Sequence, residues 1–121
     1  MAELIHFVDN RGRDVFANWV SALKDKRAAA RIALRLTRLE CDLFGDCKSL
    51  GDGVWELRIN DGPGYRIYYG QLKKTVILLL CGGDKRTQKA DIKAGQGILD
   101  AMASAGSQMS VSVISMQYET V

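Results

Sequence analysis

The sequence lacks the long apolar segments and the patterned cysteines that mark membrane and secreted proteins. No apolar run reaches the roughly 18 residues of a membrane-spanning helix, so no contact with a membrane is expected. The N-terminal segment has no basic start followed by an apolar core, and we expect no signal peptide. Cysteine occurs only at Cys41, Cys47 and Cys81, an odd number without the spacing of metal ligands. This pattern favours reduced thiols in a cytoplasm over a disulfide framework or a zinc site.

The sequence also lacks the motifs of cofactor and nucleophile chemistry. The run from Gly82 to Lys85 does not have the spacing of a phosphate-binding loop, and we recognise no metal-ligand cluster or nucleophile triad. The single histidine, His6, is an acid–base residue by type, but no partner motif accompanies it, so we expect a structural role. If the protein is an enzyme, its mechanism is therefore expected to use no metal and no cofactor.

Length and composition indicate one small soluble domain. The 121 residues are 47% apolar and 26% charged, and the net charge of +3 is modest. We expect the domain to comprise residues 1–103. The sequence then becomes rich in serine and valine, and we interpret residues 104–121 as a tail that is flexible or pairs with a sheet edge. That edge could belong to a second molecule, so a homo-oligomer through the tail is left open.

The hydrophobic pattern predicts an α+β domain with its helices packed on one face of a small sheet. Two N-terminal helices, one C-terminal helix and an antiparallel-dominated sheet are expected. Residues 45–53 are predicted to be a loop. The aliphatic run over 75–81 is typical of a central strand buried on both faces, and it should end at Gly82. The predicted elements are a strand over 3–8, helices over 14–23 and 27–43, strands over 54–60, 65–72 and 75–81, and a helix over 87–103.

Cationic side chains interrupt the predicted sheet. Arg58 and Arg66 lie inside otherwise apolar strands, those predicted over 54–60 and 65–72. Lys85 and Arg86 come just after the next predicted strand, over 75–81. Alternation along the middle strand should place Arg66 on the same face as Tyr68. A cluster of cations across a sheet indicates an anion site more than a core.

The predicted helix over 27–43 combines an apolar stripe with a basic one. The apolar stripe consists of Ile32, Leu36, Leu39 and Leu43. The arginines follow the same period on a neighbouring face without an acidic residue between them. Two interpretations stay open for them: phosphate contacts with RNA, which carry no base specificity, or an ordinary solvated helix face. The basic stripe consists of Arg27, Arg31, Arg35 and Arg38.

Two stretches of the sequence resemble one known family. They are GDGVWELRINDGPGYRIYY, which spans the first two strands of the predicted sheet, and LLLCGGDKRTQKADI, which follows. Both are similar to the RelE/ParE toxin superfamily, and the similarity is closest to the HigB-like addiction-module killer proteins. The upstream segment KDKRAAARIALRLTRLE resembles the second helix of that family. The resemblance covers residues 3–103 and not the tail.

The resemblance implies the cytoplasmic toxin of a type II toxin–antitoxin module, with a RelE-like fold and a co-expressed antitoxin as partner. RelE-like members bind the ribosome and cut mRNA without a metal. A ribose 2′-OH attacks the adjacent phosphate and leaves a 2′,3′-cyclic phosphate. Two alternatives stay open: a ParE-like poison of DNA gyrase, and a degenerate member that only binds its antitoxin. The antitoxin is expected to lay a helix or strand on the basic surface.

The resemblance also suggests roles for individual residues. Arg66 matches the arginine that stabilises charge on the phosphate, although a pairing with Glu56 or a solvated position is the plainer interpretation. Arg58 and Lys85 match basic positions near that phosphate. Asp91 falls near the place of a family tyrosine and is a candidate proton acceptor, or simply a favourable charge at a helix start. The expected RNA-binding residues are Arg27, Arg31, Arg35, Arg38, Lys48, Arg86 and Lys89. One of Tyr65, Tyr68 and Tyr69 could stack on a base, unless all three belong to the core.

Overall fold

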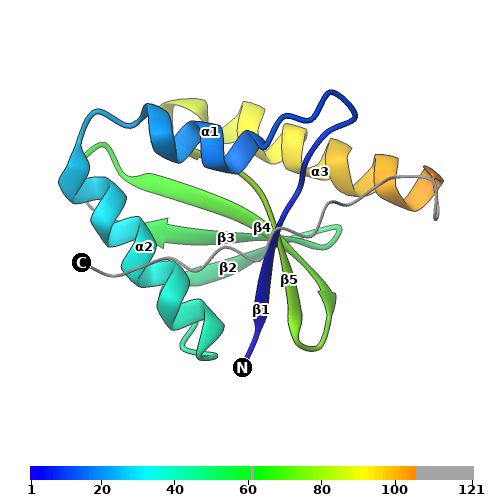
Figure 1. The fold of residues 1–121 in the computed structure, drawn as a ribbon, viewed down its shortest axis with the longest axis horizontal. Coiled ribbons are helices and arrows are strands. Elements are labelled where there is room, and N and C mark those ends of the chain that lie inside the picture. Colours follow the sequence, from blue (N-terminus) through cyan, green and yellow to red (C-terminus); the bar gives the residue numbers. More distant parts are fainter. Residues whose placement is uncertain (61, 106–121) are drawn as a thin grey trace.

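The computed structural model describes residues 1–60 and 62–105, with side chains up to residue 102. It is an α+β domain, as predicted, and its sheet has five strands (Figure 1). The predicted tail lies outside the described residues except for its first two, which belong to the last helix. The elements are β1 (Glu3–His6), α1 (Val15–Ala22), α2 (Lys26–Glu40), β2 (Cys47–Gly51), β3 (Val54–Ile59), β4 (Tyr65–Lys73), β5 (Val76–Asp84), a 3-10 turn (Lys85–Thr87) and α3 (Gln88–Ala105).

The sheet is mixed, with strand order β1-β5-β4-β3-β2. β1 pairs with β5 in parallel, and the other neighbouring strands are antiparallel. β5 lies between β1 and β4, and its residues from Ile77 to Cys81 are buried. The prediction of a central strand for this aliphatic run is therefore confirmed. A helix-containing connection joins β1 to the rest of the sheet, as a parallel pairing requires.

The predicted end of the central strand is wrong, because β5 continues through Gly82 and Gly83 to Asp84. The two glycines are close-approach positions and not a turn. The ring of Trp19 occupies the place of a side chain at Gly82, and the side chains of Asp91 and Thr87 occupy that place at Gly83. Helices on both sides can therefore approach the strand here, which only glycine permits.

The prediction that the helices pack on one face is also wrong. α1 and α2 cover one face, where Phe16 and Ile32 join a core with Ile67 of β4. α3 covers the other face, where Ile92, Leu99 and Met102 pack against buried residues such as Tyr68 and Leu80. The physical reason is that β3, β4 and β5 carry apolar residues on both faces. Each face therefore needs a covering layer.

Helix α2 ends earlier than predicted. The backbone turns at Asp42, which has a φ of 61°, while its N–H donates to Leu39 O and that of Leu43 to Arg38 O. This pair of hydrogen bonds is a Schellman motif, which closes a helix. Leu43 consequently lies outside the helix and is 62% exposed, so its predicted place in the apolar stripe is wrong. Ala28 completes the buried stripe at the other end.

The predicted loop over 45–53 contains a strand instead. β2 pairs antiparallel with β3 and forms one edge of the sheet. Its residues are mostly polar and exposed, so its burial pattern gives little signal in the sequence. Its pairing places Lys48 directly opposite Glu56. No helix among residues 1–60 and 62–105 is long and apolar enough to cross a membrane.

Candidate anion-binding site

Arg58 and Arg66 lie directly opposite each other on neighbouring strands. The register of β3 and β4 pairs them, and that of β4 and β5 pairs Arg66 with Gly83. Side chains of directly paired residues point to the same face, here the face covered by α3. The neighbouring cross-strand pair, Leu57 and Ile67, points into the opposite core. The antiparallel pairing thus brings the two predicted phosphate-binding arginines together.

A buried carboxylate holds this arginine pair. Glu56 lies two residues before Arg58 on the same face of β3, and its side chain is fully buried. Arg58 Nε donates to Glu56 Oε1 over 2.9 Å, and Arg66 Nε lies 4.0 Å from the same oxygen. Gln88 Nε2, from the first turn of α3, donates to Oε2 over 2.7 Å. Two arginines opposite one another would repel, and Glu56 offsets that repulsion.

The charges of this cluster shift the pKa of Glu56. Burial raises the pKa of its carboxyl, but the hydrogen bonds from Gln88 and Arg58 and the charges of Arg58 and Arg66 outweigh burial, so the pKa is lowered. Conversely, the hydrogen bond to Glu56 raises the pKa of Arg58. Glu56 is therefore ionised at neutral pH. The three side chains together carry a single positive charge.

Arg66 is more enclosed than a solvated strand arginine. It is 7% exposed, and its Nη1 donates to the carbonyl oxygen of Tyr65 over 3.3 Å. Within the described part of the chain its Nε is buried without a hydrogen bond, and so is the hydroxyl of Tyr68. Burial, followed by the charges of Glu56 and Asp91, raises the pKa of Tyr68. Both donors lie in the enclosed part of the cluster, near Glu56, and are closed to solvent.

Lys85 borders the same end of the sheet. Its aliphatic chain lies against Gly64, in the turn between β3 and β4, where a Cβ would come within 3.0 Å of Lys85 Cε. This contact places it beside the strand residues that lead to Arg66. Arg86, in the same 3-10 turn, is engaged differently: its Nη2 lies 3.0 Å from Asp84 Oδ2, and this partnership lowers the pKa of Asp84. The Arg86 side chain nevertheless remains 82% exposed.

Asp91 lies at the start of α3, next to the arginine pair. Its carboxylate occupies the space above Gly83, the residue paired with Arg66. Thr87 Oγ1 donates to Asp91 Oδ2 over 2.5 Å, and Cys81 Sγ donates to the Asp91 backbone oxygen over 3.4 Å. Asp91 is partly exposed. The structure thus brings this predicted acid–base candidate onto the face that carries Arg58 and Arg66.

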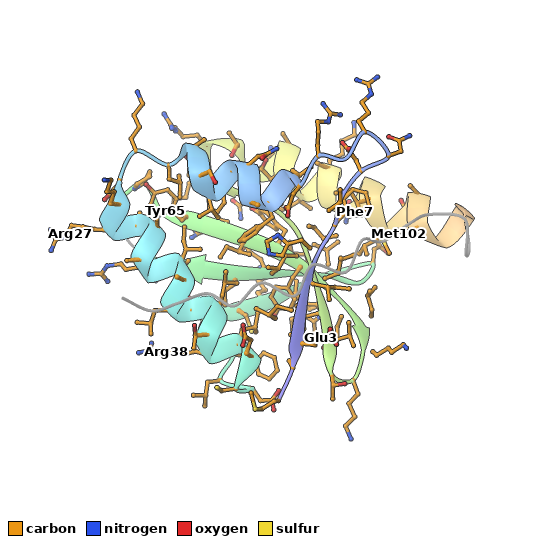
Figure 2. All side chains as sticks on the ribbon, viewed as in Figure 1. Glu3, Phe7, Arg27, Arg38, Tyr65 and Met102 are labelled. Carbon is orange, nitrogen blue, oxygen red and sulfur yellow. The ribbon has the colours of Figure 1, made fainter. Side chains whose placement is uncertain are left out.

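The remaining predicted RNA contacts divide between two faces. Lys48 lies on the Arg66 side of the sheet, because it is paired with Glu56, and Lys89 is exposed on α3. The arginines of α2 lie beyond the opposite face, and Arg27 and Arg38 project outward there (Figure 2). Arg35 has a structural role, since its Nη1 donates to Arg58 O over 2.7 Å. Arg35 of α2 thus contacts the backbone of Arg58, whereas the side chains of the arginine pair lie on the face that α3 covers.

The aromatic and histidine expectations resolve in favour of the core. Tyr65, Tyr68 and Tyr69 are all buried, so none is available to stack on a base. His6 is buried as well, and its Nδ1 lies 2.8 Å from Asp14 Oδ2. Asp14 also accepts from the backbone N–H of Ala17 and caps α1. His6 therefore links β1 to the start of α1, as a structural residue does.

Sequence reasoning missed the roles of Glu56 and Gln88 in this site. Glu56 was considered only as a competing partner of Arg66, whereas it contacts both arginines and α3. A signal for it exists in the sequence. Glu56 and Arg58 alternate in an otherwise apolar strand, and a charged residue inside such a strand needs a partner.

Comparisons with known proteins establish the class to which this domain belongs. Residues 18–102 match the family model described as phage-derived protein Gp49-like (DUF891), and the chain belongs to this family. It is a RelE/HigB-like toxin family of toxin–antitoxin modules, so an antitoxin is the expected partner. A Haemophilus influenzae protein described as uncharacterized is 51% identical over 78 residues, which cover 64% of this chain and 79% of the relative.

Proposed function

We propose that this protein is a HigB-like toxin that inhibits translation by cutting mRNA in the ribosome without a metal. The observation that supports this proposal is the cross-strand pair of Arg58 and Arg66, held by a buried carboxylate on the face that Asp91 approaches, at the end of the sheet that Lys85 borders. Guanidinium groups bind phosphate oxygens through parallel hydrogen bonds. The proposal therefore assigns the scissile phosphodiester to this pair.

The charge of the cluster suits the reaction. A phosphodiester carries one negative charge, which equals the single positive charge of Glu56, Arg58 and Arg66 together. Attack on phosphorus gathers further charge on the phosphoryl oxygens, and the proposal assigns Lys85, at the same end of the sheet, as a second cation for that charge. Fixed donors aimed at developing charge lower the barrier because they need no reorganisation during the reaction. Positioning of the 2′-OH against the phosphate supplies the remaining reduction of the reaction barrier.

Each bond and proton in the proposed step has an assigned place. The ribose 2′ oxygen forms a bond to phosphorus and loses its proton to the Asp91 carboxylate. The bond from phosphorus to the 5′ oxygen breaks, which leaves a 2′,3′-cyclic phosphate. The departing 5′ oxygen, stabilised by Lys85, takes a proton from a water molecule and becomes a hydroxyl, and the hydroxide that remains takes the proton back from Asp91. Asp91 is suited to this role by its partial exposure and its place above Gly83.

The basic residues outside the pair are proposed to bind RNA backbone. Lys48, Arg86 and Lys89 would contact the mRNA. Arg27 and Arg38 on α2 would contact ribosomal RNA, since they project from the opposite side of the molecule (Figure 2), and so would Arg31, which is exposed on the same helix. Such contacts give affinity that falls with salt and carries no base preference. The antitoxin would neutralise the toxin in the cytoplasm by covering one of these surfaces.

Primer extension on a defined mRNA, with purified protein and with or without translating ribosomes, tests the proposal. Cuts at codon boundaries only when ribosomes are present are the expected result. Cuts without ribosomes would remove the ribosome from the proposal. Absence of cuts, with folded protein and arrested growth, would contradict it and favour a gyrase poison. Absence of both cuts and arrested growth would indicate a member that only binds its antitoxin.

A further inference from the structure

Glu56 has an arrangement that charge compensation alone does not require. A single contact would pair one arginine, but Glu56 Oε1 lies near Nε of both arginines, at 2.9 Å from Arg58 and 4.0 Å from Arg66. Its second oxygen accepts from Gln88 of α3 at 2.7 Å. The carboxylate is fully buried and so cannot itself meet a nucleic acid. The Glu56 carboxylate can therefore influence a bound ligand only through Arg58 and Arg66.

We propose that Glu56 is the positioning residue of the phosphate site, which fixes both guanidinium groups side by side and sets the site's charge to that of one phosphodiester. This inference rests on the proposed function. The role is distinct from a general base, because Glu56 touches no substrate. It is also distinct from a simple structural ion pair, because it predicts opposite effects on RNA binding and on cleavage.

The geometry of Arg58 supports a positioning role. Its bond to Glu56 uses Nε, which leaves the two Nη groups outside that bond. An arginine has five N–H donors, so four remain for phosphate oxygens after this contact. The backbone of the same residue is held as well, since Arg58 O accepts from Arg35 and Arg58 N donates to Asp46 O over 2.9 Å. Arg58 is therefore fixed at both its backbone and the root of its guanidinium.

The position of Gln88 extends the site to helix α3. Its bond to Glu56 crosses from the first turn of α3 to the middle of β3. Gln88 thereby prevents rotation of the carboxylate away from the arginines. When an orienting group is lost, the groups that it held can shift by about 1 Å. A shift of that size can reduce the reaction rate by about 100-fold, although every substrate contact is still possible. Removal of the Glu56 charge should therefore impair cleavage more than binding.

The experiment compares wild type, Glu56→Gln and Glu56→Asp in two assays. The first is ribosome-dependent cleavage. The second is binding of a fluorescent single-stranded oligonucleotide with 2′-O-methyl groups, which cannot be cut, over a series of salt concentrations. Asp9→Asn is the matched control, because Asp9 also contacts an arginine Nε, that of Arg13, over 2.8 Å but away from the site.

We expect Glu56→Gln to reduce cleavage by about 100-fold and to bind the oligonucleotide at least as tightly as wild type. Its plot of log affinity against log salt should steepen by about 0.7, because one more phosphate charge is neutralised. Glu56→Asp, which keeps the charge but shortens the side chain, should lose cleavage with an unchanged salt slope. Asp9→Asn should match wild type in both assays.

Two results would overturn the inference. One is wild-type cleavage by Glu56→Gln; the other is a parallel loss of cleavage, oligonucleotide affinity and melting temperature, which would make Glu56 merely structural. If the wild type itself cuts nothing, the proposed function fails, and the binding series still decides the role of Glu56. An unchanged salt slope in Glu56→Gln would then refute the charge-setting role.

Discussion

Arg66 of β4 is paired in register with Gly83 of β5, and the carboxylate of Asp91 fills the space that a side chain at Gly83 would occupy. The absence of a side chain at one residue thus lets an acidic group on α3 approach a buried arginine two strands from the edge. The relationship connects backbone geometry to the chemistry proposed for the site. It also makes Gly83 a sensitive position.

Gly83→Ala should displace the side chains of Asp91 and Thr87, which lie too close for any Cβ. We expect a loss of stability of about 1–3 kcal/mol, as for other overpacking substitutions, together with loss of cleavage. Urea unfolding and primer extension measure the two effects. Gly97→Ala is the control, because within the described residues nothing lies within 4 Å of its Cβ position. That variant should gain about 0.5–1 kcal/mol, since alanine is the better helix former. A Gly83→Ala protein as stable as wild type would contradict the packing described.

Arg66→Ala should remove the arginine proposed to stabilise charge on the phosphate. We expect cleavage to fall by about 100-fold or more, the usual effect of losing one transition-state donor. The fold should persist, because Glu56 keeps its bonds to Arg58 and Gln88. Growth after induction and circular dichroism of the purified protein provide the measurements. Arg13→Ala, at an exposed arginine, is the control, and full toxicity of Arg66→Ala would exclude Arg66 from the mechanism.

The pKa of Glu56 predicts how stability depends on pH. The folded-state pKa lies below the ordinary value of 4.5, so the unfolded chain binds a proton more readily than the folded one. The resulting stability is fully present above pH 4.5 and is lost as the pH falls through the folded-state pKa. Urea unfolding of wild type and Glu56→Gln measures this dependence. The difference in unfolding free energy between the two proteins should narrow as the pH falls from 4.5 through the folded-state pKa of Glu56. A difference that stays constant over that range would contradict the prediction.

Arg35 and Arg38 should respond differently to alanine although both belong to the basic stripe of α2. Arg35 donates to three backbone oxygens, those of Arg58, Phe44 and Asp46. Its removal leaves acceptors without a donor and should cost about 1–3 kcal/mol in thermal or urea unfolding. Arg38 is exposed, and its removal should change stability by no more than about 0.5 kcal/mol. Arg38→Ala should instead weaken ribosome binding. Equal losses of unfolding free energy in Arg35→Ala and Arg38→Ala would refute the distinction between a structural Arg35 and a surface Arg38.

Much of the fold could be predicted because hydrophobic periodicity marks it strongly. The burial of β5 follows from its aliphatic run, and the shared face of Arg66 and Tyr68 follows from strand alternation. β2 could not be predicted in the same way, since an exposed polar edge strand has no apolar pattern. The glycines at the end of β5 were mistaken for a turn, because a sequence does not show which helix will pack against them.

The candidate site was predictable in its charges but not in its connections. Arg58, Arg66, Lys85 and Asp91 do gather at one end of the sheet, but the carboxylate between the arginines depends on tertiary burial. The position of the α2 arginines relative to that site depends on which face each helix covers. Both features depend on the folded structure and cannot be predicted from the order of residues alone. The likeness of the arrangement to RelE in particular stays a prediction.

The parallel pairing of β1 with β5 affects how the domain can fold while it is being translated. β1 precedes β2, β3 and β4 in the chain, whereas its partner strand β5 is translated only after them. The hairpin that carries Arg58 and Arg66 is local and can form early, but the central contacts close a long loop and form late. The nascent chain therefore remains an incomplete sheet until nearly the whole domain has left the ribosome. For the toxin proposed above, an antitoxin made at the same time has that interval in which to be present before the arginine pair is in place.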